Sequence, residues 1–355
     1  MPYILNILFC CLYLSFVRIN HWRDLWKALP VMLIWTAIAG AQVNIGADYP
    51  MYLRYFDHRE CVPESRYEPL FALITDLSIK IGWYKHGPFF VFAFINVLLV
   101  FIGGKMAQVR RWAIYYFLII TVAVIFNNQM NAVRQATAVG ISFLAIIAFY
   151  RNKLLGIALV LLAMGFHYSA LICIMGLWIK PITNFTSRFP LTLLLIAFAS
   201  AFIEGATQNF NNWLLNQIPD FLSEEVHYQE AYADSEYSHS TNFIYRASKI
   251  IQIPLYWKSL ILIKKNELSA WEKDLFHLGF LAFMLRNVFL LNTLTGRFSY
   301  YFWIPAIFPI YYLMRYYWNK RQIAPFIIIV LWCLVPYVAK IIVGTQNYGT
   351  TFLWD

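Results

Sequence analysis

Long apolar runs separated by short polar segments make up almost the whole chain. Residues 88–104 and 325–343 carry too few charges for soluble core helices and approach the roughly 20 residues needed to cross a bilayer. The apolar residues do not alternate with polar ones, so the pattern favours helices over the strands of a membrane barrel. We therefore predict an all-α, polytopic integral membrane protein that forms a single transmembrane domain over residues 1–355.

The same pattern predicts about twelve spans and one helix that does not cross. Residues 67–83 carry Asp76 and Lys80, and we interpret them as a re-entrant or interfacial amphipathic helix. The first run lacks a preceding basic stretch and a following cleavage site, so we expect an anchor rather than a removed signal peptide. The predicted spans are residues 3–17, 28–45, 88–104, 112–126, 130–150, 154–166, 168–179, 189–205, 243–263, 274–295, 298–318 and 325–343.

Lysine and arginine residues orient these spans, because short cytoplasmic loops are enriched in both. Arg18, Arg23 and Lys27 place the first loop in the cytoplasm, and both chain ends then lie outside, provided that residues 67–83 do not cross. Such an orientation brings the unusual polar clusters to the outer side, as expected of an active site that faces one compartment. These clusters are Gly46-Ala47-Asp48-Tyr49, Tyr67-Glu68-Pro69, Asn131 with Arg134-Gln135, Phe166-His167-Tyr168-Ser169 and Gly296-Arg297-Phe298.

Composition supports the membrane class and excludes others. The 355 residues are 61% hydrophobic and 13% charged, whereas soluble domains average about 45–50% and about 25%. The net charge of +10 is explained by the basic cytoplasmic loops, so we do not expect nucleic-acid binding. The cysteines show no pairing pattern, and we therefore expect no disulfide framework, no metal site and no cofactor.

The longest polar segment, residues 206–242, is predicted to be an external loop. It combines acidic side chains such as Glu224 and Glu230 with aromatic ones such as Trp213 and Tyr232. Carboxylates accept hydrogen bonds from sugar hydroxyls and rings stack on apolar sugar faces, so this composition suits sugar recognition. A solvated loop without a ligand explains the same composition equally well.

Two acidic residues of the outer face are candidates for proton transfer. Asp48 ends the second predicted span, where its carboxylate suits a general base or an acceptor for sugar hydroxyls, and Tyr49 beside it is a candidate substrate contact. Glu68 precedes Pro69, so it is expected to end an extended stretch at the entry of a helix. The alternatives are a solvated acid in a helix C-terminal turn for Asp48 and a favourable helix-dipole interaction for Glu68.

Asn131, Arg134 and Gln135 are spaced i, i+3, i+4, which predicts that they share one face of a helix over residues 130–150. An arginine inside a span usually faces a cavity or a partner, so the three side chains suggest a lined pocket. Snorkelling of Arg134 to the outer boundary is the alternative.

His167 lies between two short apolar arms, at the tip of a predicted hairpin. A histidine changes charge near neutral pH, which suits it to proton transfer or to contact with an anion. The alternative is a hydrogen-bonded structural histidine.

Arg286 and Arg297 are eleven residues apart, about three turns, so they would face the same way in an unbroken helix. Gly296 interrupts that argument if it ends the helix. Arg286 would lie near the middle of the membrane, where an arginine is expected to be functional or ion-paired. Because arginine forks bind phosphate oxygens bidentately, both residues, with Tyr300 nearby, suggest a lipid-linked phosphate or pyrophosphate ligand.

The motifs occur in the order that a known family shows. Asn131-Ala132-Val133-Arg134-Gln135-Ala136 and Phe166-His167-Tyr168-Ser169-Ala170 are the most specific, and Arg297-Phe298-Ser299-Tyr300-Tyr301 follows them. Over roughly residues 1–345 the chain resembles the EpsG family of polysaccharide biosynthesis proteins, which overlaps with Wzy-type O-antigen and capsule polymerases. Ala47 departs from the pattern, where threonine or serine is more usual.

The resemblance implies a metal-independent membrane glycosyltransferase without a cofactor, located in the bacterial inner membrane. Undecaprenyl-pyrophosphate-linked oligosaccharides would be both donor and acceptor, the active site would face the periplasm, and membrane lipids and a chain-length regulator would be partners. We expect Asp48, Glu68 or His167 to take the proton. We assign Arg134, Arg286 and Arg297 to the pyrophosphate, and Asn131 and Gln135 to orienting phosphate or sugar.

Three other functions are alternatives to a polymerase. An O-antigen ligase would use similar donors on the same side and is the closest alternative. A lipid-linked oligosaccharide flippase would need polar residues in both halves of the membrane, and the inner half has few. A membrane O-acyltransferase would not explain the outer arginines.

Overall fold

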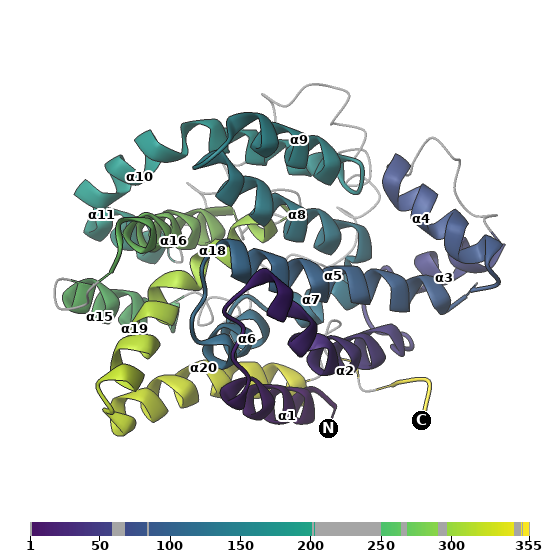
Figure 1. The fold of residues 1–355 in the computed structure, drawn as a ribbon, viewed down its shortest axis with the longest axis horizontal. Coiled ribbons are helices and arrows are strands. Elements are labelled where there is room, and N and C mark those ends of the chain that lie inside the picture. Colours follow the sequence, from purple (N-terminus) through teal and green to yellow (C-terminus); the bar gives the residue numbers. More distant parts are fainter. Residues whose placement is uncertain are drawn as a thin grey trace. The chain divides into compact units, whose positions relative to one another are not determined.

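The computed structural model describes residues 2–58, 68–83, 85–200, 202, 250–263, 268–289, 297–343, 349 and 351–354 (Figure 1). Across these ranges the regular structure is helical, apart from one isolated β-bridge between Gln42 and Phe352. The predicted all-α class is therefore confirmed. The predicted external loop, residues 206–242, lies outside the described residues.

Residue contacts divide the chain into two compact units. The first consists of Met1–Leu177 with Val330–Asp355, and the second of Trp178–Ile329. The single transmembrane domain proposed from the sequence stays a prediction.

The first unit is built from short and long apolar helices. In chain order they are α1 (Pro2–Phe16), η1 (Trp22–Ala28), α2 (Leu29–Gly40), α3 (Tyr49–His58), α4 (Pro69–Lys80), α5 (Gly87–Met106), α6 (Trp112–Thr121), α7 (Ile125–Asn131), α8 (Val133–Phe149), α9 (Lys153–Met164) and η3 (Tyr168–Trp178), followed by the second part of α20 (Ile323–Val343).

Several of these helices are suited to a bilayer. In the part of the chain that the structure describes, α5, the helical stretch Tyr168–Arg188 and residues Ile323–Ile342 of α20 are each long and apolar enough to cross one. α6 and α7 pass the same test together, with a bend of 43° between them. Large apolar side chains remain uncovered, such as Phe16, which is 79% exposed, as lipid-facing residues would be. The chain is a helical membrane protein, while the count of about twelve spans remains a prediction.

α4 is the helix that was expected not to cross. It has 12 residues and is therefore about 18 Å long, whereas the hydrocarbon core of a bilayer is about 30 Å thick. α4 alone is too short to span it.

The basic loops of the first unit meet at one end. Trp112 at the start of α6 donates from its indole Nε1 to the carbonyl oxygen of Ile19 at 3.2 Å. Lys105 at the end of α5 donates to the carbonyl oxygen of Asn20. The residues predicted to be cytoplasmic lie on these segments or next to them: Arg18, Arg23, Lys27, Lys105, Arg110 and Arg111.

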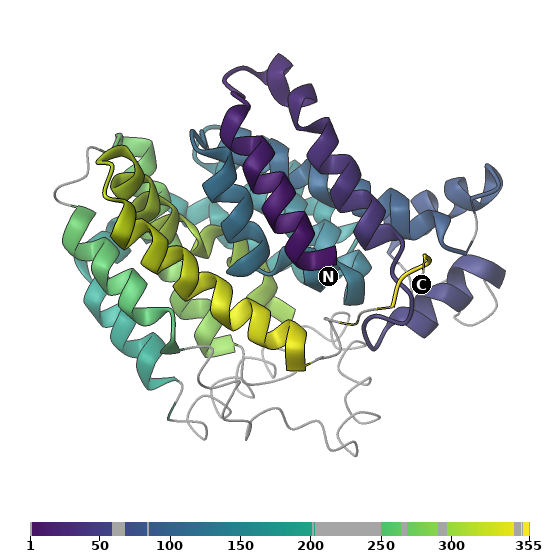
Figure 2. The same cartoon turned by 90° about the horizontal axis from the view of Figure 1, so that it is seen from below.

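The opposite end gathers the other termini of the same helices. Tyr3 at the start of α1 packs edge-on against Phe126 of α7 and against Phe352, with ring centroids 6.0 Å apart in both pairs. Phe352 in turn forms the β-bridge with Gln42, just after α2. Figure 2 shows the C-terminal segment, in yellow, beside the chain that follows α2. α1 and α2 therefore connect the basic end to this end of the unit. We call it the polar end, because Asp48 follows α2 there.

α9 and η3 form a hairpin whose tip lies at the polar end. Gly156 near the start of α9 and Gly176 near the end of η3 both pack against Phe149, the last residue of α8. At the other end the carbonyl oxygen of Gly165 accepts the N–H of Leu70, at the start of α4, at 2.8 Å. His167 follows Gly165 and lies at the hairpin tip, where the sequence pattern placed it.

The predicted unbroken helix over residues 130–150 is wrong. α7 ends at Asn131, Ala132 is non-helical with φ −110° and ψ 65°, and α8 begins at Val133. Asn131 therefore does not share a helix face with Arg134. The break has a tertiary cause, because Gly46 lies directly against the Asn131 backbone and side chain.

The second unit is organised around α16 (Ala270–Phe289). α16 packs against α10 (Ile179–Arg188), α11 (Pro190–Ala199), α18 (Trp303–Ala306) and α19 (Phe308–Asn319), and α19 also contacts α15 (Ile253–Ile263). The predicted span over residues 298–318 is divided among η5 (Tyr300–Phe302), α18 and α19, as expected where Pro305 and Pro309 remove backbone donors.

Candidate functional site

A buried ion pair connects α8 to the residue that precedes α4. Glu68 has extended backbone, φ −62° and ψ 141°, and Pro69 begins the helix, as predicted for a residue before proline. The rest of the predicted extended stretch lies outside the described residues. Arg134 in the first turn of α8 donates from Nη1 to Glu68 Oε2 at 2.7 Å. The Glu68 side chain is 1% exposed and the Arg134 side chain 18%. Because both charges are removed from water, loss of either partner would leave the other charge buried and uncompensated.

Aromatic side chains complete the surroundings of Arg134. Its Nε lies 3.4 Å from the hydroxyl oxygen of Tyr52, on α3, and its guanidinium group lies 5.8 Å from the ring centroid of Phe71, on α4. Burial raises the pKa of Tyr52, the positive charge of Arg134 lowers it, and the negative charges of Asp48 and Glu68 raise it. Two carboxylates, one guanidinium and one phenol therefore act on one another.

Gly46 and Asn131 hold Asp48 next to this ion pair. The Asn131 Oδ1 accepts the backbone N–H of Asp48 at 3.3 Å. Gly46 has φ +92°, and a Cβ built on it would lie 2.5 Å from Asn131 Oδ1. Only glycine fits this close approach with that backbone conformation. The Gly-x-Asp-Tyr motif and the Asn-x-x-Arg motif therefore meet directly.

One oxygen of Glu68 has no hydrogen-bond partner. Arg134 occupies Oε2, whereas Oε1 is buried and unpartnered. Leaving a buried acceptor unsatisfied costs about 1–3 kcal/mol, so such an atom is expected to serve a ligand. Oε1 is suited to accept a proton or a hydrogen bond from a hydroxyl group.

His167 is oriented by its neighbour Ser169. The Ser169 Oγ lies 2.7 Å from His167 Nδ1, and the Ser169 backbone N–H donates to the same nitrogen at 3.4 Å. A neutral ring that accepts this N–H at Nδ1 carries its proton on Nε2 and can donate from there. The contact with Ser169 Oγ fits either tautomer, so His167 stays a candidate for proton transfer.

The remaining candidates of the first unit, Tyr49 and Gln135, are buried. Tyr49 is 4% exposed and stacks on Phe89 of α5, with ring centroids 5.2 Å apart. Gln135 is likewise buried, on α8. Neither side chain is displayed on the surface.

In the second unit, Trp303 joins two of the candidates. The Arg286 guanidinium lies 4.9 Å from the centroid of the Trp303 ring, and Tyr300 packs edge-on against the same ring at 4.6 Å. Arg297 is partly buried in the helical segment before η5. The structure describes α16 as far as Phe289, and residues 290–296 lie outside the described residues, so the alignment of Arg286 with Arg297 stays a prediction.

The comparison with known families decides the identity. The sequence model of the EpsG family matches residues 26–351. The chain belongs to the EpsG family. No curated protein and no solved structure matches this EpsG-family chain. Membership associates it with polysaccharide biosynthesis and with glycosyltransferase-like polymerases.

The structure of this EpsG-family protein holds a second buried ion pair, which the sequence pattern did not reveal. Arg315 of α19 donates to Glu272 of α16. Arg315 lies three residues inside the predicted span 298–318, whereas Glu272 lies two residues before the predicted span 274–295. Their positions along the chain therefore do not identify them as partners.

Several polar residues near Arg134 were also missed. Tyr52 is four residues after Asp48, and that helical spacing would have placed it on the same face. The Asn127-Asn128-Gln129 run interrupts an apolar stretch just before Asn131 and was visible in the sequence. In the described residues of this EpsG-family chain, no group of three or more histidine, cysteine, aspartate or glutamate side chains could hold a metal ion.

Proposed function

We propose that the chain is a polysaccharide polymerase that joins undecaprenyl-pyrophosphate-linked glycan repeat units at the outer face of the bacterial inner membrane. Its family and its apolar helices support the general function. The observation that carries the reaction is the Glu68–Arg134 pair, in which Glu68 Oε1 is buried and unpartnered.

Glycosyl transfer needs one proton acceptor and one stabilised leaving group. The acceptor hydroxyl oxygen attacks the anomeric carbon of the donor sugar, and the bond from that carbon to the pyrophosphate oxygen breaks. Glu68 Oε1 takes the hydroxyl proton, and undecaprenyl pyrophosphate departs with the bonding electrons. Arg134 holds Glu68 through Oε2, which aims Oε1.

The other candidates take supporting roles in this proposal. His167 donates from Nε2 to a substrate oxygen, because Ser169 engages Nδ1. Asp48 is the second carboxylate beside Tyr52, and its charge strengthens the field that draws the hydroxyl proton. Arg286 and Arg297 of the second unit are the proposed contacts of a pyrophosphate group, which fixed positive charge stabilises.

The lipid carriers would enter between helices, because a polyprenyl tail does not leave the bilayer. The compartment rests on the basic end of the first unit, since Lys and Arg are enriched in cytoplasmic loops. The polar end would then face the periplasm, where a chain-length regulator is a further proposed partner.

Deletion of the gene in the native host, followed by gel profiling of lipopolysaccharide or capsule, tests the function. If the protein is a polymerase, the deletion strain makes only single repeat units attached to the core. Free lipid-linked polymer would instead indicate an O-antigen ligase, and lipid-linked units held in the cytoplasm a flippase.

Complementation with variants then tests the site. Wild type restores long chains, and Glu68→Gln, expressed at the wild-type level, leaves single-repeat material. Asp57→Asn is the matched control, because it makes the same kind of change at a carboxylate of α3 that pairs with Lys85 at 3.9 Å. Long chains from Glu68→Gln would refute the assignment of the base.

A further inference from the structure

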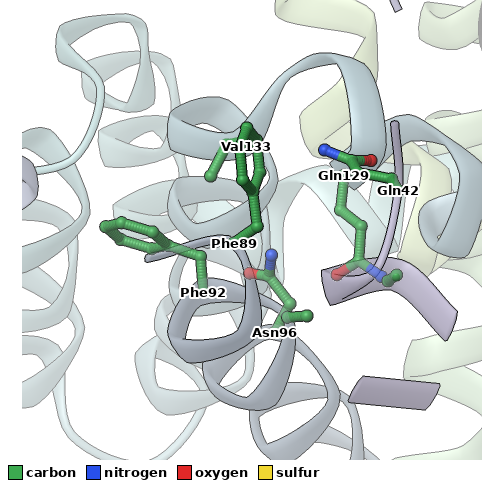
Figure 3. A pocket seen from close by; sticks show the side chains of 8 residues that line it. Gln42, Phe89, Phe92, Asn96, Gln129 and Val133 are labelled. Atoms are coloured by element: carbon green, nitrogen blue, oxygen red, sulfur yellow. The ribbon is translucent and has the colours of Figure 1, made fainter. Parts of the chain in front are cut away.

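A small cavity lies between α5, the end of α2 and the segment that joins α7 to α8. Its volume is about 10 Å³, which is room for about one water-sized group. Figure 3 shows the side chains that line it, with Phe89, Phe92 and Asn96 coming from α5. Gln42 and Gln129 contribute two further amides, so three amide side chains face one cavity.

These amides are buried, and several of their polar atoms have no partner. Gln42 is 1% exposed, and Asn96 and Gln129 are each 3% exposed. Gln42 Oε1, Asn96 Oδ1 and both polar atoms of the Gln129 amide make no hydrogen bond. Most buried polar atoms are satisfied, so unpartnered atoms around one cavity point to a group that enters it.

The side chains that line the cavity indicate which chemical group it can bind. Every polar lining side chain is a neutral amide, and each amide offers an acceptor oxygen and a donor NH₂. A phosphate has only acceptor oxygens and would meet no lysine or arginine here. A sugar hydroxyl both donates and accepts and is close to a water molecule in size, so it fits.

The cavity adjoins the proposed catalytic pair. Val133 in its wall is the residue before Arg134, and Gln129 lies on α7 together with Asn131. Phe89 in the wall stacks on Tyr49, which follows Asp48. A sugar that inserts a hydroxyl group here would lie beside the segments that carry Asp48 and Arg134.

The helix that carries Gln129 is held in an unusual conformation. Val124, immediately before α7, has φ 55° although it is β-branched and buried. α7 is bent by 43° from α6 and ends after seven residues at the break before α8. A β-branched residue in the left-handed region is rare, and such strain concentrates at ligand sites.

We propose that this cavity is a glycan subsite, which takes one sugar hydroxyl group of the lipid-linked substrate. The subsite rests on the proposed polymerase function and adds to it the part of the protein that recognises the sugar. It separates sugar recognition, by neutral amides, from the charged pair that performs proton transfer.

Apolar variants of similar shape test the subsite. Gln129→Met and, independently, Asn96→Leu remove unpartnered polar atoms from different helices. Thr75→Val is the matched control, because Thr75 Oγ1 is also buried and unpartnered but lies on α4, outside the cavity lining. Each full-length protein is purified in detergent, and its Tm and its transfer activity are measured with lipid-linked repeat units extracted from the deletion strain.

The subsite predicts that both cavity variants keep or raise the wild-type Tm while the KM for the repeat unit rises about tenfold, the equivalent of one hydrogen bond. Thr75→Val keeps the wild-type KM. A lowered Tm in both cavity variants would show that the amides serve the fold and would overturn the subsite, as would an unchanged KM. Inactive wild-type enzyme would instead overturn the polymerase function, and the subsite with it.

Discussion

Two buried arginine–glutamate pairs, one in each unit, differ in what surrounds the carboxylate. In the first unit, Arg134 binds one oxygen of Glu68 and the other oxygen has no partner. In the second unit, Arg315 binds Oε1 of Glu272, and the Ser269 backbone N–H donates to Oε2 at 2.9 Å. One oxygen of Glu68 therefore lacks a hydrogen-bond partner, whereas both oxygens of Glu272 have one.

The arginines differ in the same sense. Arg315 is enclosed, with a side chain 6% exposed and a guanidinium group 5.0 Å from the centroid of the Tyr312 ring. The Arg134 side chain is 18% exposed and lies beside the Asp48 and Asn131 motifs. A satisfied buried pair is expected of a structural connection, whereas an unsatisfied one is kept where a ligand completes it. The two pairs are therefore expected to respond differently to substitution.

Removal of both charges in the first unit is expected to have the largest effect. Glu68→Leu with Arg134→Met replaces the pair by apolar side chains, which buried pairs often tolerate without loss of stability. Transfer activity should fall by about 10²–10⁴-fold, the usual contribution of a general base. Purified enzyme assayed with lipid-linked repeat units measures the loss, and activity within threefold of wild type would contradict the role of the pair.

The second pair should affect stability instead. Arg315→Met leaves the Glu272 charge buried without compensation, and we expect a loss of about 3–5 kcal/mol. Adding Glu272→Leu removes that charge and should restore most of the stability together with the activity. Thermal unfolding in detergent and membrane abundance report both steps. If the double variant folded well but made no polymer, the second pair would also belong to the active site.

Gly46 tests how the motifs of the first unit are joined. Gly46→Ala introduces a Cβ 2.5 Å from Asn131 Oδ1 at φ +92°, so we expect a loss of about 1–3 kcal/mol and displaced Asn131 contacts. Gly82→Ala is the matched control, since Gly82 has φ +86° and no atom within 4 Å of the added Cβ. Both variants share the backbone strain, and only Gly46→Ala should also impair transfer. Equal transfer activity in the Gly46→Ala and Gly82→Ala variants would show that the contact between Gly46 and Asn131 is not needed for transfer.

The break after Asn131 shows where local sequence reasoning fails. Hydrophobic runs locate the helices, and Pro69 predicts the extended conformation of Glu68, because both effects act between neighbouring residues. Ala132 contains no local cause for a break. The cause is Gly46, far away in the chain, which packs against Asn131.

The pairing of charges was equally inaccessible to sequence reasoning. The sequence pattern predicts that Arg134 binds pyrophosphate and that Glu68 is one of three candidates for the proton, and it does not pair them. The two residues are separated by 66 positions and bind each other. A polar residue inside a span can be recognised from its energetic cost. Which partner offsets that cost depends on tertiary packing.

Tyr52 offers the finest test of the first pair, because the charges of Arg134, Asp48 and Glu68 all act on its phenol. Tyr52→Phe keeps the ring that packs on Phe71 at 5.9 Å and removes only the hydroxyl group beside Arg134 Nε. A hydrogen bond to a charged group contributes about 1.5–3 kcal/mol, and this one is long at 3.4 Å. We therefore expect stability close to wild type and transfer slowed by about tenfold. Tyr55→Phe is the control, a buried tyrosine of the same helix that stacks on Phe71. Because Arg134 loses a neighbour but keeps Glu68, the defect should be smaller than that of Glu68→Gln and should appear in kcat more than in KM. A Tyr52→Phe enzyme indistinguishable from the Tyr55→Phe control would show that Arg134 is positioned by Glu68 alone.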